Sequence, residues 1–148
     1  MLAAMADQPS PARRVLVIED SDDLRNLLSR ILSREGYDVV GVDDGSVGIS
    51  WARDDIDVVV LDLGLPGMSG LDVCRQLRAD RATAELPIIV LTGRSDRRDV
   101  RDGLVAGADA FLIKPVQLGA LIDAVGWLSN GRPAETAHLT TTATSSAY

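Results

Sequence analysis

The sequence predicts an α/β fold in which a doubly wound, five-stranded parallel sheet is flanked by five helices. Short, continuously apolar runs alternate along the chain with longer segments whose apolar residues recur at helical spacing. Strands that are apolar along their whole length are covered on both faces, as in a parallel sheet. Several of these runs end in acidic or polar residues, and the carboxyl edge of such a sheet is where a ligand binds.

The first strand is predicted over residues 15–18, where Val-Leu-Val-Ile forms an unbroken apolar run. An amphipathic helix follows, because leucine and isoleucine recur three and four residues apart. Ser21 is placed to cap the start of this helix and Gly36 to end it. A second, short strand is predicted over residues 38–42.

A short helix over residues 46–53 leads to the third strand, which is predicted over residues 58–61 and is fully apolar. Ser69 and Asp72 then match a capping box, in which a hydroxyl and an acid satisfy the first free amides of a helix. That helix carries apolar residues on one face, at Leu71, Cys74 and Leu77.

The fourth strand is predicted over residues 87–91, and Ser95 is expected to cap a helix that reaches about Ala106. The fifth strand follows over residues 110–113. A last helix carries an apolar stripe formed by Leu118, Leu121, Ile122, Val125 and Leu128.

The domain is predicted to cover residues 13–130, with a disordered arm over residues 1–12 and a disordered tail over residues 131–148. The tail is rich in serine, threonine and alanine, and such a composition buries too little apolar area to order itself. His138 lies in this tail, so no metal or catalytic role is expected for it.

The composition excludes several kinds of function. The net charge is −7 and aromatic residues make up 3% of the chain, so direct nucleic-acid binding is not expected. One cysteine allows no disulfide within the chain, which is typical of a reducing cytoplasm. No apolar stretch approaches membrane-spanning length. The protein is therefore predicted to be cytoplasmic.

Five polar side chains follow the predicted strands. Glu19 and Asp20 follow the first strand, Asp62 the third, Thr92 the fourth and Lys114 the fifth. Because the carboxyl ends of parallel strands meet at one edge, these side chains are expected to share a small pocket. Lys114 is also the only lysine among 15 basic residues, which favours a role for a compact ammonium rather than a guanidinium fork.

This set of groups predicts phosphoryl chemistry. Clustered carboxylates repel one another and need a cation, and an all-oxygen site without histidine or thiolate favours Mg²⁺ or Mn²⁺. A carboxylate can act as a nucleophile toward phosphorus. The hydroxyl of Thr92 and the ammonium of Lys114 could stabilise phosphoryl oxygens. A single acid at a strand end can also be a helix cap or a surface charge, as we expect for Asp22 and Asp23. Thr92 alone could be a turn residue and Lys114 a surface charge, whereas Asp62 fits such an explanation least because it closes an apolar strand.

The sequence resembles the receiver domain of bacterial response regulators over about residues 13–130. The motifs are Val15–Asp20, Asp62–Gly70, Thr92–Gly93, Gly107–Phe111 and Lys114–Pro115. The resemblance implies a fold like that of the chemotaxis regulator, which is flavodoxin-like with strand order 2-1-3-4-5. It also implies a phosphoprotein of a two-component system rather than an enzyme.

By this resemblance Asp62 is the phosphoacceptor. Asp20 would be a direct ligand of Mg²⁺, and Glu19 would act nearby through water. Asp62 and the backbone carbonyl of Gly64 would complete the metal site.

The resemblance also implies a switch. Thr92 would turn toward the phosphoryl group while Lys114 pairs with one of its oxygens. Phe111 occupies the place of the family's switch aromatic, although plain core packing would also explain it. The Lys114–Pro115 peptide bond is cis in the family.

Two residues are expected to tune the lifetime of the phosphoryl group. Gly64 is small where the family often has a bulkier residue, and it would leave room for attacking water. Arg94 is large and charged, and it could lean over the same space.

The expected partners are a sensor histidine kinase or a histidine phosphotransfer protein, and a downstream protein target. In the family the first helix receives the kinase, which here would involve Arg25, Leu28 and their neighbours. The segment 117–120 lacks the charges of receivers that dimerise through the last helices, so a monomer or weak dimer is expected. Ala124 and Trp127 lie off the last apolar stripe, and either form a partner surface or cover the sheet edge.

Four functions compete. The favoured one is a single-domain response regulator in a phosphorelay, and the first alternative is a receiver cut from a larger DNA-binding regulator. An aspartyl-nucleophile phosphatase usually has a second acid two residues after the nucleophile, where this chain has Gly64. An inactive scaffold would not need the complete acidic set and the lysine.

Overall fold

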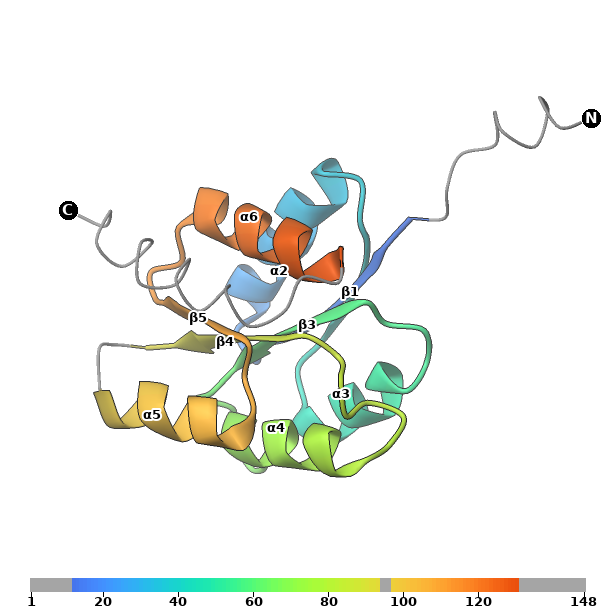
Figure 1. The fold of residues 1–148 in the computed structure, drawn as a ribbon. Coiled ribbons are helices and arrows are strands. Elements are labelled where there is room, and N and C mark those ends of the chain that lie inside the picture. The colour runs from blue at the N-terminus through green and yellow to red at the C-terminus, as the bar shows by residue number, and fades with distance from the viewer. Residues whose placement is uncertain (1–11, 94–96, 131–148) are drawn as a thin grey trace, which may run out of the picture.

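The computed structural model describes residues 12–93 and 97–130, which contain five strands and five helices (Figure 1). The strands are β1 (Arg14–Ile18), β2 (Asp38–Val42), β3 (Val58–Asp62), β4 (Ile88–Thr92) and β5 (Ala110–Ile113). The helices are α2 (Asp22–Arg34), α3 (Gly45–Ala52), α4 (Gly70–Ala79), α5 (Arg97–Ala106) and α6 (Leu118–Ser129). All strand pairs are parallel, in the order β2-β1-β3-β4-β5. The predicted fold class and strand order are confirmed.

The sheet separates two apolar layers. Helices α2 and α6 cover one face, and α3, α4 and α5 cover the other (Figure 1). Alternate residues of β1 enter opposite layers, with Val15 and Val17 on the α2/α6 side and Leu16 and Ile18 on the other. Strands β3 and β4 are buried at every residue. This double coverage explains why their sequences are continuously apolar.

The predicted caps define two helix starts. The hydroxyl of Ser21 accepts a hydrogen bond from the amide of Leu24, and that of Ser69 accepts one from the amide of Asp72. Gly36 follows the C-cap residue Glu35 at the end of α2, and its φ of 97° lies in the left-handed region that favours glycine. Ser21, Ser69 and Gly36 thus act as predicted, whereas the carboxylate of Asp72 pairs with Arg75 instead of reaching back to the amide of Ser69 as a full capping box requires.

Helix α3 begins one residue before its predicted start. A carboxylate oxygen of Asp44 accepts hydrogen bonds from the amides of Ser46 and Val47, at 2.8 and 3.1 Å. This capping makes Gly45 the first helical residue. The predicted cap at Ser95 lies outside the described residues.

The expectation that Ala124 lies off the apolar face of α6 is wrong. Ala124 is 1% exposed and belongs to the core between the sheet, α2 and α6. Trp127 is partly buried and packs against the same core. Trp127 therefore contributes to the packing of this layer.

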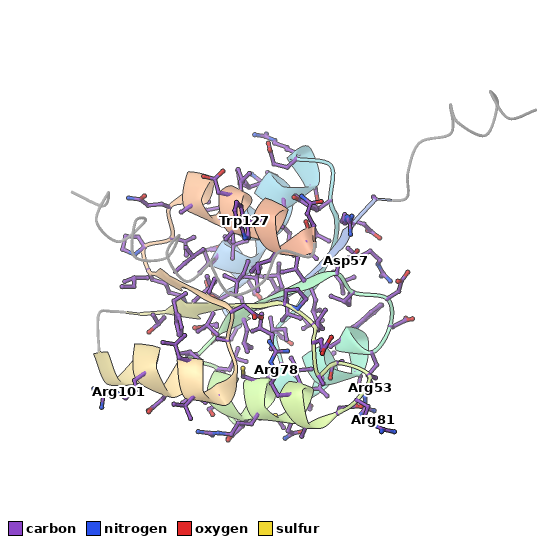
Figure 2. The ribbon with its side chains drawn as sticks, viewed as in Figure 1. Arg53, Asp57, Arg78, Arg81, Arg101 and Trp127 are labelled. Atoms are coloured by element: carbon purple, nitrogen blue, oxygen red, sulfur yellow. The ribbon has the colours of Figure 1, made fainter. Side chains whose placement is uncertain are left out.

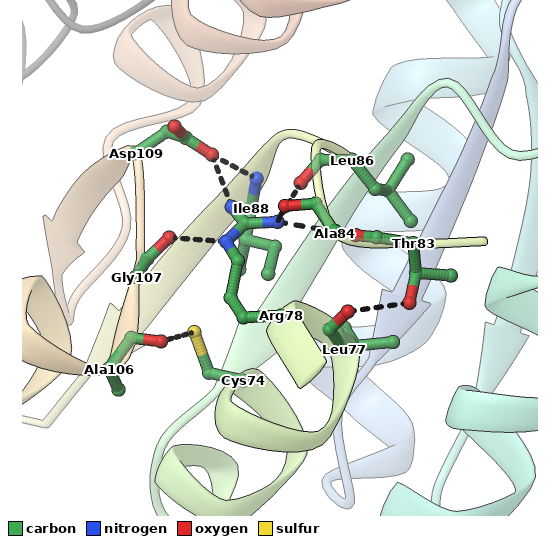
Figure 3. Close-up of polar contacts among 10 residues, drawn as sticks. All are labelled: Cys74, Leu77, Arg78, Thr83, Ala84, Leu86, Ile88, Ala106, Gly107 and Asp109. Atoms are coloured by element: carbon green, nitrogen blue, oxygen red, sulfur yellow. Dashed lines mark hydrogen bonds and ion pairs between the residues drawn. The ribbon is translucent and has the colours of Figure 1, made fainter. Parts of the chain in front are cut away.

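Arg78 of α4 binds the two loops that lead into β4 and β5, at the amino edge of the sheet (Figure 3). Its guanidinium donates to the carbonyl oxygens of Gly107, Ala84 and Leu86, at 2.9, 3.1 and 2.6 Å. It also pairs with Asp109 at 2.8 Å. Figure 2 shows Arg78 inside the fold, whereas Arg101 lies at the surface.

Cys74 is buried next to this arginine. Its thiol donates to the carbonyl of Ala106 at 3.3 Å, which joins α4 to α5 (Figure 3). Burial raises the pKa of Cys74 to about 11. The thiol is therefore a packing group rather than a reactive one. In the part of the chain that the structure describes, no helix has the length and apolar composition needed to cross a membrane.

Candidate functional site

Three carboxylates meet where β1 and β3 end. Oxygen atoms of Glu19, Asp20 and Asp62 lie within 4.8 Å of one another. Glu19 is fully buried, Asp62 is 3% exposed, and Asp20 is exposed at the mouth of the site. The strand-end prediction therefore brought these three residues together correctly.

Lys114 closes the site from the end of β5. Its Nζ lies 3.0 Å from Oε1 of Glu19 and 3.2 Å from Oδ2 of Asp62. Its side chain is 27% exposed, so the ammonium reaches inward past the end of the sheet. The Lys114–Pro115 peptide bond is cis, as the resemblance implied.

The backbone fixes where these side chains start. The amide of Glu19 donates to the carbonyl of Val42 at 3.0 Å, and the amide of Lys114 donates to the carbonyl of Thr92 at 2.7 Å. Gly64 donates its amide to Oδ1 of Asp62 at 3.0 Å. Glu19, Asp62 and Lys114 are thus held at or just after the ends of their strands by the neighbouring strand or loop.

The site is electrostatically unbalanced. Burial raises the pKa of Glu19, against hydrogen bonds from Ser21 and Lys114 that lower it. Burial by itself lowers the pKa of Lys114, but its contacts with Glu19 and Asp62 outweigh this and the net pKa is raised. Lys114 therefore stays charged, and its single positive charge faces three carboxyl groups.

The donor set fits a hard divalent cation. Carboxylate and carbonyl oxygens are the ligands that Mg²⁺ and Mn²⁺ prefer, and the described residues of the cluster contribute no nitrogen or sulfur ligand. Glu19, Asp20 and Asp62 are close enough to share one ion. A divalent cation here would offset the repulsion that Lys114 alone leaves.

Thr92 ends β4 beside this cluster. It is 1% exposed, and its hydroxyl has no hydrogen-bond partner among the described residues. A buried hydroxyl without a partner is costly, by about 1–3 kcal/mol. The hydroxyl is therefore available to a group that enters the site.

Phe111 is turned into the core. It is 2% exposed, and its ring lies against Gly103 of α5 so closely that a Cβ at Gly103 would come within 2.6 Å of the ring's Cζ. The importance of Gly103 was not predicted, because nothing in its local sequence indicates the ring. Phe111 pairs with Val90 of β4 in the sheet, and Val90 lies two residues before Thr92 in the chain.

Of the two residues expected to tune the lifetime of the phosphoryl group, the structure describes Gly64. A Cβ at Gly64 would lie 3.6 Å from Oδ1 of Asp62, at ordinary contact distance, so the residue leaves open space above the carboxylate. Arg94 lies outside the described residues.

The expected partner face of α2 requires a correction. Leu28 is fully buried, so it cannot contact a kinase. Arg25 also turns away from solvent, and donates to the carbonyl of Glu19 at 2.9 Å. The exposed residues of this helix include Asn26, Leu27 and Arg30.

Comparison with known proteins gives a consistent family. Residues 15–126 match the model of the response regulator receiver domain. The DNA-binding response regulator MtrA of Mycolicibacterium smegmatis is 42% identical over 111 residues, which are 74% of this chain and 47% of that protein. This chain spans about half the length of the curated relatives it matches.

Solved structures show the same architecture. The Vibrio cholerae chemotaxis protein CheY4 matches with a TM-score of 0.75 and 26% identity, over 80% of this chain and 99% of that one. The receiver domain of the Pseudomonas aeruginosa sensor histidine kinase PA1611 matches with a TM-score of 0.76 and 26% identity. That match covers 82% of this chain and 100% of that one, which has a magnesium ion coordinated in its active site cleft.

Proposed function

Since this chain belongs to the family of response regulator receiver domains, we propose that Asp62 is its phosphoacceptor. The donor would be a phosphohistidine on a sensor histidine kinase or a histidine phosphotransfer protein. The observation that supports this most is the position of Asp62, a buried carboxylate 3.2 Å from Lys114 and within 4.8 Å of two more acids. Such an arrangement favours phosphorus chemistry on an oxygen nucleophile.

The transfer forms one bond and breaks one. An oxygen of Asp62 bonds to phosphorus as the bond between phosphorus and the histidine nitrogen breaks, and the imidazole keeps the electron pair. Lys114 would then pair with a phosphoryl oxygen, and the hydroxyl of Thr92 would donate to another. This role would give the buried Thr92 hydroxyl the partner it lacks among the described residues.

Glu19, Asp20, Asp62 and the backbone carbonyl of Gly64 would hold Mg²⁺, with Mn²⁺ as a substitute. When bound, the ion would neutralise negative charge on the phosphoryl oxygens. Asp20 is the exposed acid at the mouth, which suits a direct ligand, while the buried Glu19 is already engaged by Lys114.

Phosphorylation would act as a switch. We propose that Thr92 moves toward the phosphoryl group and that Phe111 adjusts with it, which alters the surface formed by β5 and its neighbours. Gly64 would admit the water that ends the signal, and Arg94 would limit its access.

The chain is proposed to act in the cytoplasm as a signalling protein rather than as an enzyme. A single-domain regulator would bind a downstream protein, as a monomer or weak dimer without contacting nucleic acid. The second candidate is the receiver part of a DNA-binding regulator. It is favoured by relatives such as MtrA, which carry that name and of whose length this chain matches about half.

Incubation with acetyl phosphate and Mg²⁺, read by intact mass, tests the proposal. One phosphoryl adduct is expected on the parent chain and none on Asp62→Asn. Asp72→Asn is the matched control, because Asp72 is an exposed acid on α4 and should leave the adduct unchanged. An adduct that persists in Asp62→Asn would contradict the assignment.

A further inference from the structure

Arg25 lies in α2 but points toward the end of β1. Its Nη1 donates to the backbone carbonyl of Glu19 at 2.9 Å, and its Nη2 pairs with Asp22. The arginine side chain is only 18% exposed, although it belongs to the first turns of a surface helix. This arginine therefore packs against the backbone of the acidic site rather than extending into solvent.

Room for this side chain comes from β2. A Cβ placed at Gly41 would lie 3.2 Å from Cγ of Arg25 and 3.3 Å from Oγ of Ser29, which is tighter than ordinary contact. The aliphatic stem of Arg25 thus crosses the edge strand at a residue that has no side chain. Gly41 leaves space for the arginine to reach the Glu19 carbonyl.

The Glu19 backbone is held from two directions. Its amide donates to Val42 of β2, and its carbonyl accepts from Arg25. These contacts hold the two peptides on either side of Glu19, the second of which joins Glu19 to Asp20. The direction in which the Asp20 carboxylate leaves the chain depends on that peptide.

We propose that Arg25 is a positioning residue for the cation site, which it serves by holding the Glu19–Asp20 backbone. This inference rests on the proposed function, because it concerns the same Mg²⁺ site. Arg25 itself contacts no phosphoryl group and no metal ligand side chain in the contacts described above. Groups that orient metal ligands in this way typically contribute about tenfold or more to metal affinity.

The substitution Arg25→Met separates the effect of the arginine's charge on Mg²⁺ affinity from the effect of its positioning role, because the two have opposite signs. Arg25→Met keeps an unbranched stem over Gly41 but removes the donor and the positive charge. Loss of a positive charge near three carboxyl groups should by itself strengthen Mg²⁺ binding. Loss of positioning should weaken it. The sign of the change therefore separates the two explanations.

The experiment follows the amide signals of Gly64 and Asp20 by NMR as Mg²⁺ is added to the labelled, unphosphorylated full chain. Arg25→Met should raise the dissociation constant for Mg²⁺ by about tenfold. Arg25→Lys restores a charge and an N–H donor, and should bind Mg²⁺ more tightly than Arg25→Met. Arg30→Met is the matched control, since it removes an exposed charge from the same helix and should bind Mg²⁺ at least as tightly as the parent.

Equal or tighter binding by Arg25→Met than by the parent would overturn the inference. If Arg25→Met does not fold, Gly41→Ala provides the second test, because it crowds the stem while Arg25 remains. Gly41→Ala should also weaken Mg²⁺ binding, and unchanged affinity would count against the inference. A parent chain with no Mg²⁺-dependent shift would instead refute the proposed function, and the inference with it.

Discussion

Lys114 places its ammonium 3.2 Å from an oxygen of Asp62, at the carboxyl edge of the sheet. The same ammonium lies 3.0 Å from Glu19. Two carboxylates therefore share one cation before any phosphoryl group arrives. A phosphoryl group on Asp62 would compete with Glu19 for Lys114.

The acidic cluster should cost folding stability. Asp20→Asn removes one of three mutually repelling carboxylates, and we expect it to raise the free energy of unfolding by about 1 kcal/mol without Mg²⁺. The same substitution should weaken Mg²⁺ binding. Urea denaturation with and without Mg²⁺ measures both effects.

Asp72→Asn serves as the control for this comparison. Asp72 forms an exposed ion pair with Arg75, so its removal should change stability by less than about 0.5 kcal/mol. A loss of stability in Asp20→Asn would show that the cluster is not under repulsion.

The close contact between Gly103 and the ring of Phe111 predicts that a larger residue at position 103 lowers the stability of the fold. Gly103→Ala should overpack the ring of Phe111 and cost about 1–3 kcal/mol, which outweighs a gain of about 1 kcal/mol in helix propensity. Gly119→Ala is the matched control in α6, because its Cβ would meet no atom within 4 Å. Urea denaturation should show a loss for the first and a small gain for the second. Stabilisation by both would mean that the ring moves aside freely.

Arg78 should matter far more than its neighbour Arg75. Arg78→Met leaves four loop carbonyls and the Asp109 carboxylate without this donor, and should lower the free energy of unfolding by about 2–4 kcal/mol. Arg75→Met breaks one exposed pair, and should cost less than about 0.5 kcal/mol. Thermal and urea denaturation of the two variants provide the comparison, and similar losses would contradict it.

The buried thiol predicts a pH dependence. Because the pKa of Cys74 is raised to about 11 from an ordinary 9.0, the folded chain keeps the proton where the unfolded chain loses it. This contribution to stability is fully present below the ordinary pKa and is lost as the pH rises toward about 11. Iodoacetamide should therefore label native Cys74 slowly near about pH 8 and quickly after unfolding. Rapid labelling of the native chain would be inconsistent with its burial.

Much of the fold could be predicted because its signals are local. Continuous apolar runs marked β1, β3, β4 and β5, and Ser21 and Ser69 marked helix starts through contacts three residues away. The strand-end rule then placed Glu19, Asp62 and Lys114 together without any knowledge of distances. Each of these residues lies at or just after the end of a strand, and the order and parallel direction of the strands bring the three side chains together.

The errors arose where packing between distant segments decides. Ala124 is buried because α6 packs against both the sheet and α2, so its apolar face is wider than one stripe. Arg25 turns inward because Gly41, sixteen residues later, leaves room for its stem. Neither the burial of Ala124 nor the inward orientation of Arg25 can be predicted from the sequence of its own helix.

The central claim is that Asp62, and no other acid of the cluster, receives the phosphoryl group. Borohydride reduction after treatment with acetyl phosphate and Mg²⁺ converts a phosphorylated aspartate to homoserine, which peptide mass spectrometry locates in the chain. We expect homoserine at position 62 alone, and none when Mg²⁺ is removed by a chelator. Homoserine at position 20, or no reduced residue in a chain that binds Mg²⁺, would contradict the claim.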